Sequence, residues 1–135
     1  KKSSTFAPTF RLSTGYNGAP RGRKNCCDIG ECVREKLSIP RGERYELCRS
    51  VHAEANAIIS ASRQQTMGAT IYLACHDAKT GELMGGVEPC SMCKRQVLNA
   101  GIERVIVRET KDKYRIIDVN EWIENDESLF GRDSY

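Results

Sequence analysis

Two short segments, Val51-His52-Ala53-Glu54 and Pro89-Cys90-Ser91-Met92-Cys93, carry the most specific information in this chain. One histidine and two cysteines supply three ligands that suit a tetrahedral zinc ion, and sulfur ligands favour zinc over magnesium or calcium. Three protein ligands leave the fourth position for water, which is typical of a catalytic rather than a structural zinc site. Since Glu54 is not needed as a ligand, we predict that its carboxylate carries protons beside the metal.

Both segments lead into a predicted helix. Apolar residues at helical spacing predict a helix over residues 53–65. A second helix is predicted over residues 91–99, with Gly101 as its stop signal. The residues that would hold and serve the metal then lie at two helix N-termini, whose positive ends favour thiolate and carboxylate over the protonated forms.

The rest of the chain predicts strands between these helices. A buried strand is expected over residues 70–74, and further strands over residues 102–107 and 114–119. Smaller expected elements are a strand over 10–15, a tight turn with positive φ over 15–18, a helix over 31–38, a loop over 77–87 and a short helix from residue 121. Strands that alternate with helices indicate an α/β layered fold.

Length and composition predict one domain, residues 1–135. No stretch approaches the 18 or more apolar residues of a membrane span, and the first residues lack the apolar run of a signal peptide. Seven cysteines, an odd number with metal-type spacing, predict a reducing, cytoplasmic location. The net charge of +3 is too small to predict a nucleic-acid partner.

Charge is unevenly distributed along the chain. The first 24 residues hold six basic residues and no acidic one, whereas the last 18 hold six acidic residues and one basic one. These residues could simply form two solvated surfaces. The basic loop Pro20-Arg21-Gly22-Arg23-Lys24 could instead bind phosphate.

The two segments of the opening match H-x-E followed by P-C-x-x-C, the signature of zinc-dependent nucleobase deaminases. The flanking sequence is similar to the deoxycytidylate (dCMP) deaminases within that group. Residues 14–22 resemble their G-Y-N-G-x-P-x-G loop, and residues 51–58 resemble their V-H-A-E-x-N-A-I string. Residues 101–107 and the following Asp112-Lys113-Tyr114 are also similar, so the resemblance covers about residues 12–117.

This resemblance implies a cytidine-deaminase-like, three-layer α/β/α fold with a mixed central sheet flanked by helices. It implies hydrolysis of dCMP to dUMP and ammonia, which supplies dUMP for thymidylate synthesis. It further implies a homo-oligomer, commonly a hexamer, with dCTP (together with Mg²⁺) as activator and dTTP as inhibitor. The location would be the cytoplasm, or the host cytoplasm if the source is viral.

Residue roles also follow from the resemblance. Zinc is expected on His52, Cys90 and Cys93, and proton transfer at Glu54. The residues expected to contact the nucleotide are Asn17, Arg21, Ala53, Ser91 and Tyr114. Three of these also have a simpler interpretation: Asn17 as a turn residue, Arg21 as a solvated loop charge and Tyr114 as a core aromatic.

Two stretches depart from the family pattern. The family has an initial helix and a first strand before the G-Y-N-G loop, and residues 4–10 are too few to hold both. We therefore expect this edge of the domain to be missing or shortened. The loop over residues 76–88 is longer than in the simplest members, and it could cover the pocket or contact a neighbouring subunit.

Four cysteines upstream of His52 remain to be explained: Cys26, Cys27, Cys32 and Cys48. They could hold a second, structural zinc ion, or they could be free thiols.

Other functions compete with dCMP deamination. A tRNA adenosine deaminase carries H-A-E with P-C-x-M-C, which Met92 fits, but the loop over residues 14–22 and the modest charge argue against it. Deamination of dCTP, CMP or cytidine is a further alternative. In a different class, a zinc-binding module would use the same ligands only to hold its fold.

Overall fold

The computed structural model describes residues 10–126. The expected start of the domain before residue 10 lies outside the described residues, as do residues 127–135 at the end of the chain. No helix among the described residues is both long and apolar enough to cross a membrane.

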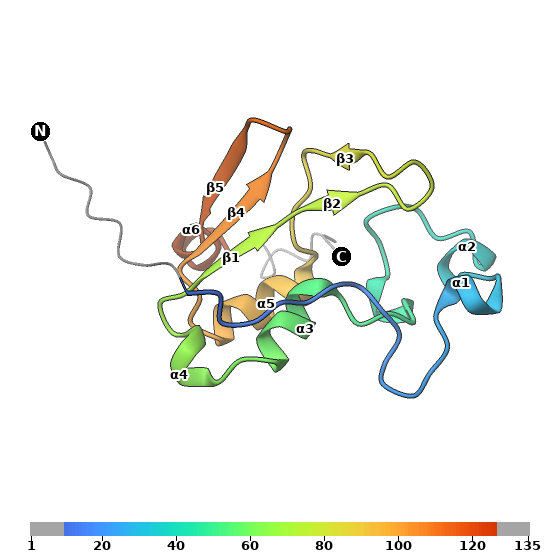
Figure 1. Cartoon of the computed structure of the whole chain (residues 1–135), viewed down its shortest axis with the longest axis horizontal. Coiled ribbons are helices and arrows are strands. Elements are labelled where there is room, and N and C mark those ends of the chain that lie inside the picture. The colour runs from blue at the N-terminus through green and yellow to red at the C-terminus, as the bar shows by residue number, and fades with distance from the viewer. Residues whose placement is uncertain (1–9, 127–135) are drawn as a thin grey trace, which may run out of the picture.

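A three-stranded mixed sheet forms the centre of the structure (Figure 1). It consists of β1 (Thr70–Leu73), β4 (Arg104–Arg108) and β5 (Tyr114–Asp118), in the order β1-β4-β5. β1 runs parallel to β4, and β4 runs antiparallel to β5. A mixed sheet with helices packed against it confirms the predicted α/β class.

The core lies where α5 (Ser91–Asn99) packs on this sheet. Its fully or almost fully buried members are apolar residues of α5, β4, β5 and their connections: Val97, Ala100, Ile102, Val105, Val107, Ile117 and Val119. Residues of α3 (Ala53–Ile59) and α6 (Asn120–Glu124) complete it, through Ile58 and Trp122. The prediction for residues 91–99 is confirmed at both ends, and the two predicted C-terminal strands are confirmed to within two residues.

The helix predicted over residues 53–65 is wrong in its extent. α3 ends at Ile59, and a separate helix α4 (Arg63–Thr66) begins after Ser62. The Ser62 hydroxyl accepts a hydrogen bond from the Gln65 N–H, and the Gln65 side chain accepts one from the Ser62 N–H. This capping box starts a new helix and interrupts the longer one.

The strand predicted over residues 10–15 is also wrong. Within the described residues this segment pairs with no strand, and the nearest pairing is a single bridge between Gly18 and Val51. The segment instead runs along α3 (Figure 1), where the Ser13 hydroxyl donates to the Ala57 carbonyl at 2.6 Å. Residues 15–18 contain no positive φ, so the turn differs from the one predicted.

β1 is an edge strand among the described residues, and it is less buried than predicted. Tyr72 at its centre is 65% exposed, and β4 is the only strand that pairs with β1 among residues 10–126. The loop predicted over residues 77–87 contains β3 (Leu83–Met84), which pairs antiparallel with β2 (Cys75–His76). Figure 1 shows this small ribbon extending beyond the end of β1.

The segment between the turn and His52 holds three short elements: α1 (Cys26–Ile29), α2 (Val33–Lys36) and the 3₁₀ helix η1 (Tyr45–Leu47). α1 was not predicted, although Asn25 and Asp28 form a capping box at its start. α2 is shorter than the helix predicted over residues 31–38. It gives way to a residue with positive φ, Ser38, before Pro40.

Candidate metal centre

The N-terminal ends of α3 and α5 carry the predicted metal ligands. His52 is the N-cap residue of α3, and Cys90 is the N-cap residue of α5. Both have extended backbone angles, and each carbonyl accepts the first hydrogen bond of its helix. Glu54 and Cys93 lie in the first turns of the same helices. Because α3 packs against α5, the structure brings all four residues together.

The ligand atoms have the separations that a tetrahedral zinc site requires. Each of the two sulfur atoms lies 3.4 Å from Nδ1 of His52. The ligand atoms of His52, Cys90 and Cys93 all lie within 4.8 Å of one another. Zn–S bonds of about 2.3 Å and a Zn–N bond of about 2.0 Å at a tetrahedral angle place sulfur and nitrogen about 3.5 Å apart. The three residues therefore fit the zinc ion predicted from the sequence.

The three ligands also shift one another's protonation. A hydrogen bond to the Cys90 sulfur raises the pKa of His52 to about 9. Hydrogen bonds from Cys93 and His52 lower the pKa of Cys90 well below that of an ordinary thiol. The pKa of Cys93 is raised by its hydrogen bond to Cys90, by burial and by the neighbouring charge of Glu54. Without metal, the centre thus holds a thiolate, a thiol and a protonated imidazole.

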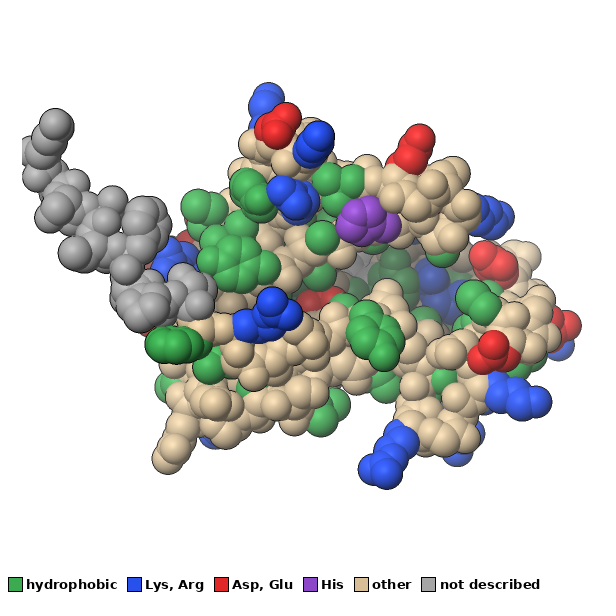
Figure 2. Space-filling view, viewed as in Figure 1, with side chains coloured by type: hydrophobic (Ala, Val, Ile, Leu, Met, Phe, Trp, Pro, Cys, Tyr) green, Lys and Arg blue, Asp and Glu red, His purple; other side chains and the backbone are tan. Residues whose placement is uncertain are grey.

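Glu54 lies next to this centre in a protected position. Its side chain is only 8% exposed and lies within hydrogen-bonding reach of Cys93. It also lines a cavity of about 820 Å³ between residues 10–15, α3 and β1. Figure 2 shows the molecule hollowed on this face. A carboxylate beside the metal ligands and in the wall of a cavity can exchange protons with a bound molecule.

Two further residues contact the ring of His52, and the sequence analysis did not assign them this role. The ring of Tyr45 packs edge-on against it, with centroids 5.6 Å apart. The thiol of Cys48 also lies close enough to contribute to the raised pKa of His52. Such contacts fix the orientation of a metal-binding imidazole. In the sequence, only the position of Cys48, four residues before His52, indicated a contact with this ring.

Asn17 links the predicted nucleotide loop to α3. Its Oδ1 accepts a hydrogen bond of 2.7 Å from the N–H of Ala53, the first residue of the helix. In return, Asn56 Nδ2 donates to the carbonyl of Tyr16 at 2.8 Å. The structure therefore places two of the predicted nucleotide contacts, Asn17 and Ala53, together beside Glu54. The hydrogen bond from Asn56 to Tyr16 was not predicted, although a polar residue among the apolar positions of α3 indicated that this side chain has a partner.

The other predicted nucleotide contacts are more scattered. Ser91 is the first residue of α5, directly after Cys90. Arg21 is exposed in the turn after Pro20. Tyr114 is 56% exposed at the start of β5, where its hydroxyl accepts a hydrogen bond from Arg108. It lies at the hairpin end of the sheet, away from the N-termini of α3 and α5 (Figure 1).

The four cysteines upstream of His52 form no second metal group within residues 10–126, where the centre described above is the only such cluster. Cys26 nevertheless lies near two of the others. Burial raises the pKa of its thiol, and the proximity of Cys32 and Cys48 adds to the increase. None of the seven cysteines, all of which lie within residues 10–126, forms a disulfide.

Comparison with known proteins points to the same chemistry. Residues 8–109 match the family model described as the cytidine and deoxycytidylate deaminase zinc-binding region. A deoxycytidylate deaminase of Mycobacterium phage D29 is 37% identical over 69% of this chain. Proteins with the same name from Schizosaccharomyces pombe and Enterobacteria phage T4 are 33% and 28% identical, over 70% and 76% of the chain. The chain spans 65%, 26% and 63% of the lengths of these three relatives.

Proposed function

The chain belongs to the cytidine and deoxycytidylate deaminase family, and we propose that it hydrolyses dCMP to dUMP and ammonia. One observation carries the proposal. The ligand atoms of His52, Cys90 and Cys93 lie within 4.8 Å of one another, with the buried carboxylate of Glu54 beside them. The name shared by the three relatives, deoxycytidylate deaminase, supports dCMP as the substrate.

In the proposed reaction, water adds at C4 of the cytosine ring and the bond from C4 to the amino nitrogen breaks. Zinc, when bound by His52, Cys90 and Cys93, supplies a water whose pKa falls from about 15.7 to roughly 7. Glu54 takes one proton from the water and gives it to N3 of the ring. It then takes the second proton from the hydroxyl now on C4 and delivers it to the amino group, which leaves as ammonia while the C4 oxygen becomes a carbonyl. Its low exposure keeps these transfers separate from bulk solvent.

We propose that the nucleotide binds in the cavity next to Glu54. The cavity volume of about 820 Å³ lies within the range of small-molecule sites, about 300–1,000 Å³. Ala53 lines this cavity with Glu54, whereas Asn17, bonded to the Ala53 N–H, and Ser91, next to Cys90, would contact the nucleotide outside the cavity. Arg21 in the basic loop is the proposed phosphate contact, and Tyr114 is a more remote candidate.

We extend the proposal to the whole molecule. Residues 1–135 act as one catalytic domain in a homo-oligomer, and dCTP and dTTP regulate it. Its location is the reducing cytoplasm, which seven free thiols support. A nucleic-acid substrate is less favoured, since Lys and Arg side chains are scattered over the face seen in Figure 2 and gather in no single patch there.

A substrate comparison tests this function. The zinc-loaded protein is incubated with dCMP, dCTP, CMP and cytidine, each with and without dCTP or dTTP as effector, and loss of the cytosine absorbance is followed. An RNA hairpin with the anticodon stem of a tRNA is the control substrate. We expect the highest kcat/KM with dCMP. Turnover of the RNA adenosine with none of the four cytosine compounds would overturn the proposal.

A further inference from the structure

Cys90 depends for its position on the chain segment that leads to it. Cys93 is held by α5 itself and is only 2% exposed. Cys90 is the N-cap residue, so its backbone lies half outside the helix, and residues 85–89 before it form no helix or strand. Contacts outside α5 must therefore fix the place at which this sulfur meets His52.

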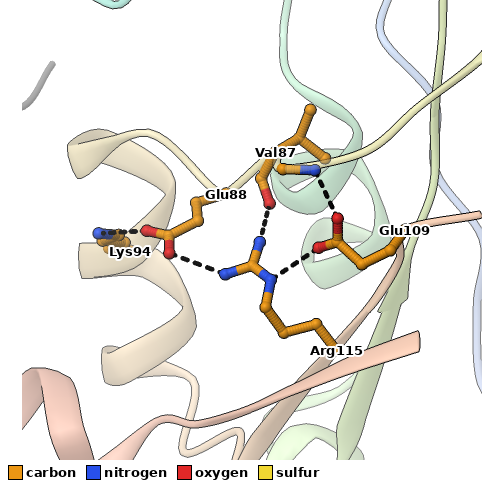
Figure 3. A network of polar contacts seen from close by, with 6 residues as sticks. Val87, Glu88, Lys94, Glu109 and Arg115 are labelled. Carbon is orange, nitrogen blue, oxygen red and sulfur yellow. Dashed lines mark hydrogen bonds and ion pairs between the residues drawn. The ribbon is translucent and has the colours of Figure 1, made fainter. Parts of the chain in front are cut away.

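Arg115 of β5 supplies most of these contacts (Figure 3). Its Nη2 donates to the Val87 carbonyl at 2.5 Å, and its Nη1 donates to Glu88 Oε1 at 2.9 Å. Its Nε donates to Glu109 Oε1 at 2.7 Å. The three nitrogens of one planar guanidinium thus contact three groups, two of them in the segment before Cys90.

The partners of Arg115 hold the same segment from other sides. Glu109 Oε2 accepts a hydrogen bond of 2.6 Å from the N–H of Gly86. Glu88 Oε2 lies 3.3 Å from Nζ of Lys94 on α5. Gly85 packs so closely that a Cβ atom there would lie 2.6 Å from the Glu109 carbonyl. Residues 85–88 are therefore fastened to β5, to the end of β4 and to α5.

We propose that Arg115 is a positioning residue for the metal centre, which sets Cys90 at its distance from His52 by holding residues 85–88. The planar, always charged guanidinium can bond a carbonyl and two carboxylates at fixed angles, which lysine cannot do. Without it, Glu88 and Glu109 lose their common cation, and the segment loses its direct bonds to β5. Residues that hydrogen-bond a metal ligand typically change metal affinity 10–100-fold when they are mutated, and Arg115 acts on Cys90 through the residues that precede it.

The test measures zinc retention and needs no substrate. Zinc transfer from the protein to an excess of a chromophoric chelator is followed for the wild type, Arg115→Met and Arg115→Lys. Arg108→Met is the matched control, because Arg108 belongs to the same hairpin and bonds the Lys111 carbonyl and the Tyr114 hydroxyl instead. We expect at least ten-fold faster release from Arg115→Met, a smaller acceleration with Arg115→Lys, and release within two-fold of wild type with Arg108→Met.

A second measurement separates positioning from loss of fold. With cobalt in place of zinc, the thiolate-to-metal charge-transfer band should weaken in Arg115→Met while the far-ultraviolet circular dichroism stays native. If Arg115→Met does not fold, Arg115→Lys carries the test alone. Wild-type release and a wild-type cobalt spectrum in the folded Arg115 variants would overturn the inference. The inference rests on the proposed metal centre, but a zinc-retaining wild type that turns over no dCMP would refute only the substrate.

Discussion

Asn17 shows how one side chain can serve both a loop and a helix. Its Oδ1 accepts the N–H of Ala53, and the Nδ2 of the same amide is the group that we propose contacts the nucleotide. We expect Asn17→Ala to lower the free energy of unfolding by about 1 kcal/mol, as for other lost helix-end bonds, and to lower kcat/KM as well. Urea denaturation and steady-state kinetics measure the two effects.

Asn17→Asp is the matched control, because it keeps an acceptor for Ala53 and replaces the amide with a carboxylate. Its stability should equal that of the wild type, while its kcat/KM should fall with that of Asn17→Ala. Full activity of Asn17→Asp would show that the Asn17 amide does not contact the substrate.

The protonation of the metal ligands before zinc binds predicts how zinc binding depends on pH. Without metal at pH 7, His52 is protonated because its pKa is about 9, Cys93 is a thiol and Cys90 is already a thiolate. Zinc must displace the protons of His52 and Cys93, so binding should release about two protons. Affinity therefore rises with pH, and the His52 contribution disappears above about pH 9.

Calorimetric titrations with zinc in buffers of different ionisation enthalpy count these protons, and competition with a chelator from pH 6 to 9 gives the affinity. A zinc affinity that did not change between pH 6 and 8 would contradict these protonation states of His52 and Cys93.

At the scale of elements, Gly15 lets the N-terminal segment lie directly on α3. A Cβ atom there would lie 2.3 Å from the Ala53 carbonyl and 2.4 Å from the Ala57 nitrogen. Because these are backbone atoms of a helix, Gly15→Ala should push the segment away. We expect a loss of about 1–3 kcal/mol in the free energy of unfolding.

Gly18→Ala in the same loop is the control, since its Cβ would have no neighbour closer than 3.7 Å and its φ is not positive. Chemical denaturation of both variants compares the two positions. Equal stability of the two variants would show that the segment does not pack on α3 as described.

The elements also show what sequence patterns can and cannot predict. α5 was predicted to its ends, and its glycine stop, Gly101, is a local signal. The continuous helix over residues 53–65 was wrong, since apolar spacing cannot reveal that Ser62 and Gln65 start a new helix. The strand over residues 10–15 was wrong because the segment packs on α3, a contact made by residues more than 40 positions away.

The same distinction applies to the metal centre. His52, Glu54, Cys90 and Cys93 could be predicted because they lie at the ends of two helices with recognisable motifs. The packing of Tyr45 on His52 and the bonds of Arg115 to residues 87 and 88 depend on how distant segments meet in space. No local sequence pattern predicts such contacts.

At the scale of the whole molecule, stability depends on the core between α5 and the sheet. Val105, in the central strand, is fully buried and lies opposite Ile71 and Ile117 on its two neighbours. Val105→Ala should cost about 2–3 kcal/mol through lost burial and the cavity left behind. Ile116→Ala on β5, where the side chain is 65% exposed, should change the free energy of unfolding by less than about 0.5 kcal/mol.

Thermal unfolding of both variants without metal measures this difference apart from the stabilisation by zinc. An equal decrease in the free energy of unfolding of the two variants would contradict the described core.

The central claim is that Glu54 carries protons for a zinc-dependent deamination at the ends of α3 and α5. The most direct test compares dUMP formation from dCMP by the wild type and by Glu54→Gln, with the zinc content of each protein measured on the same sample. We predict one zinc ion per chain at the centre in both proteins, turnover by the wild type, and a loss of about 10²–10⁴-fold in kcat for Glu54→Gln. Equal turnover by both proteins would contradict the account, whereas no turnover of dCMP by a wild type that carries its zinc would refute dCMP as the substrate.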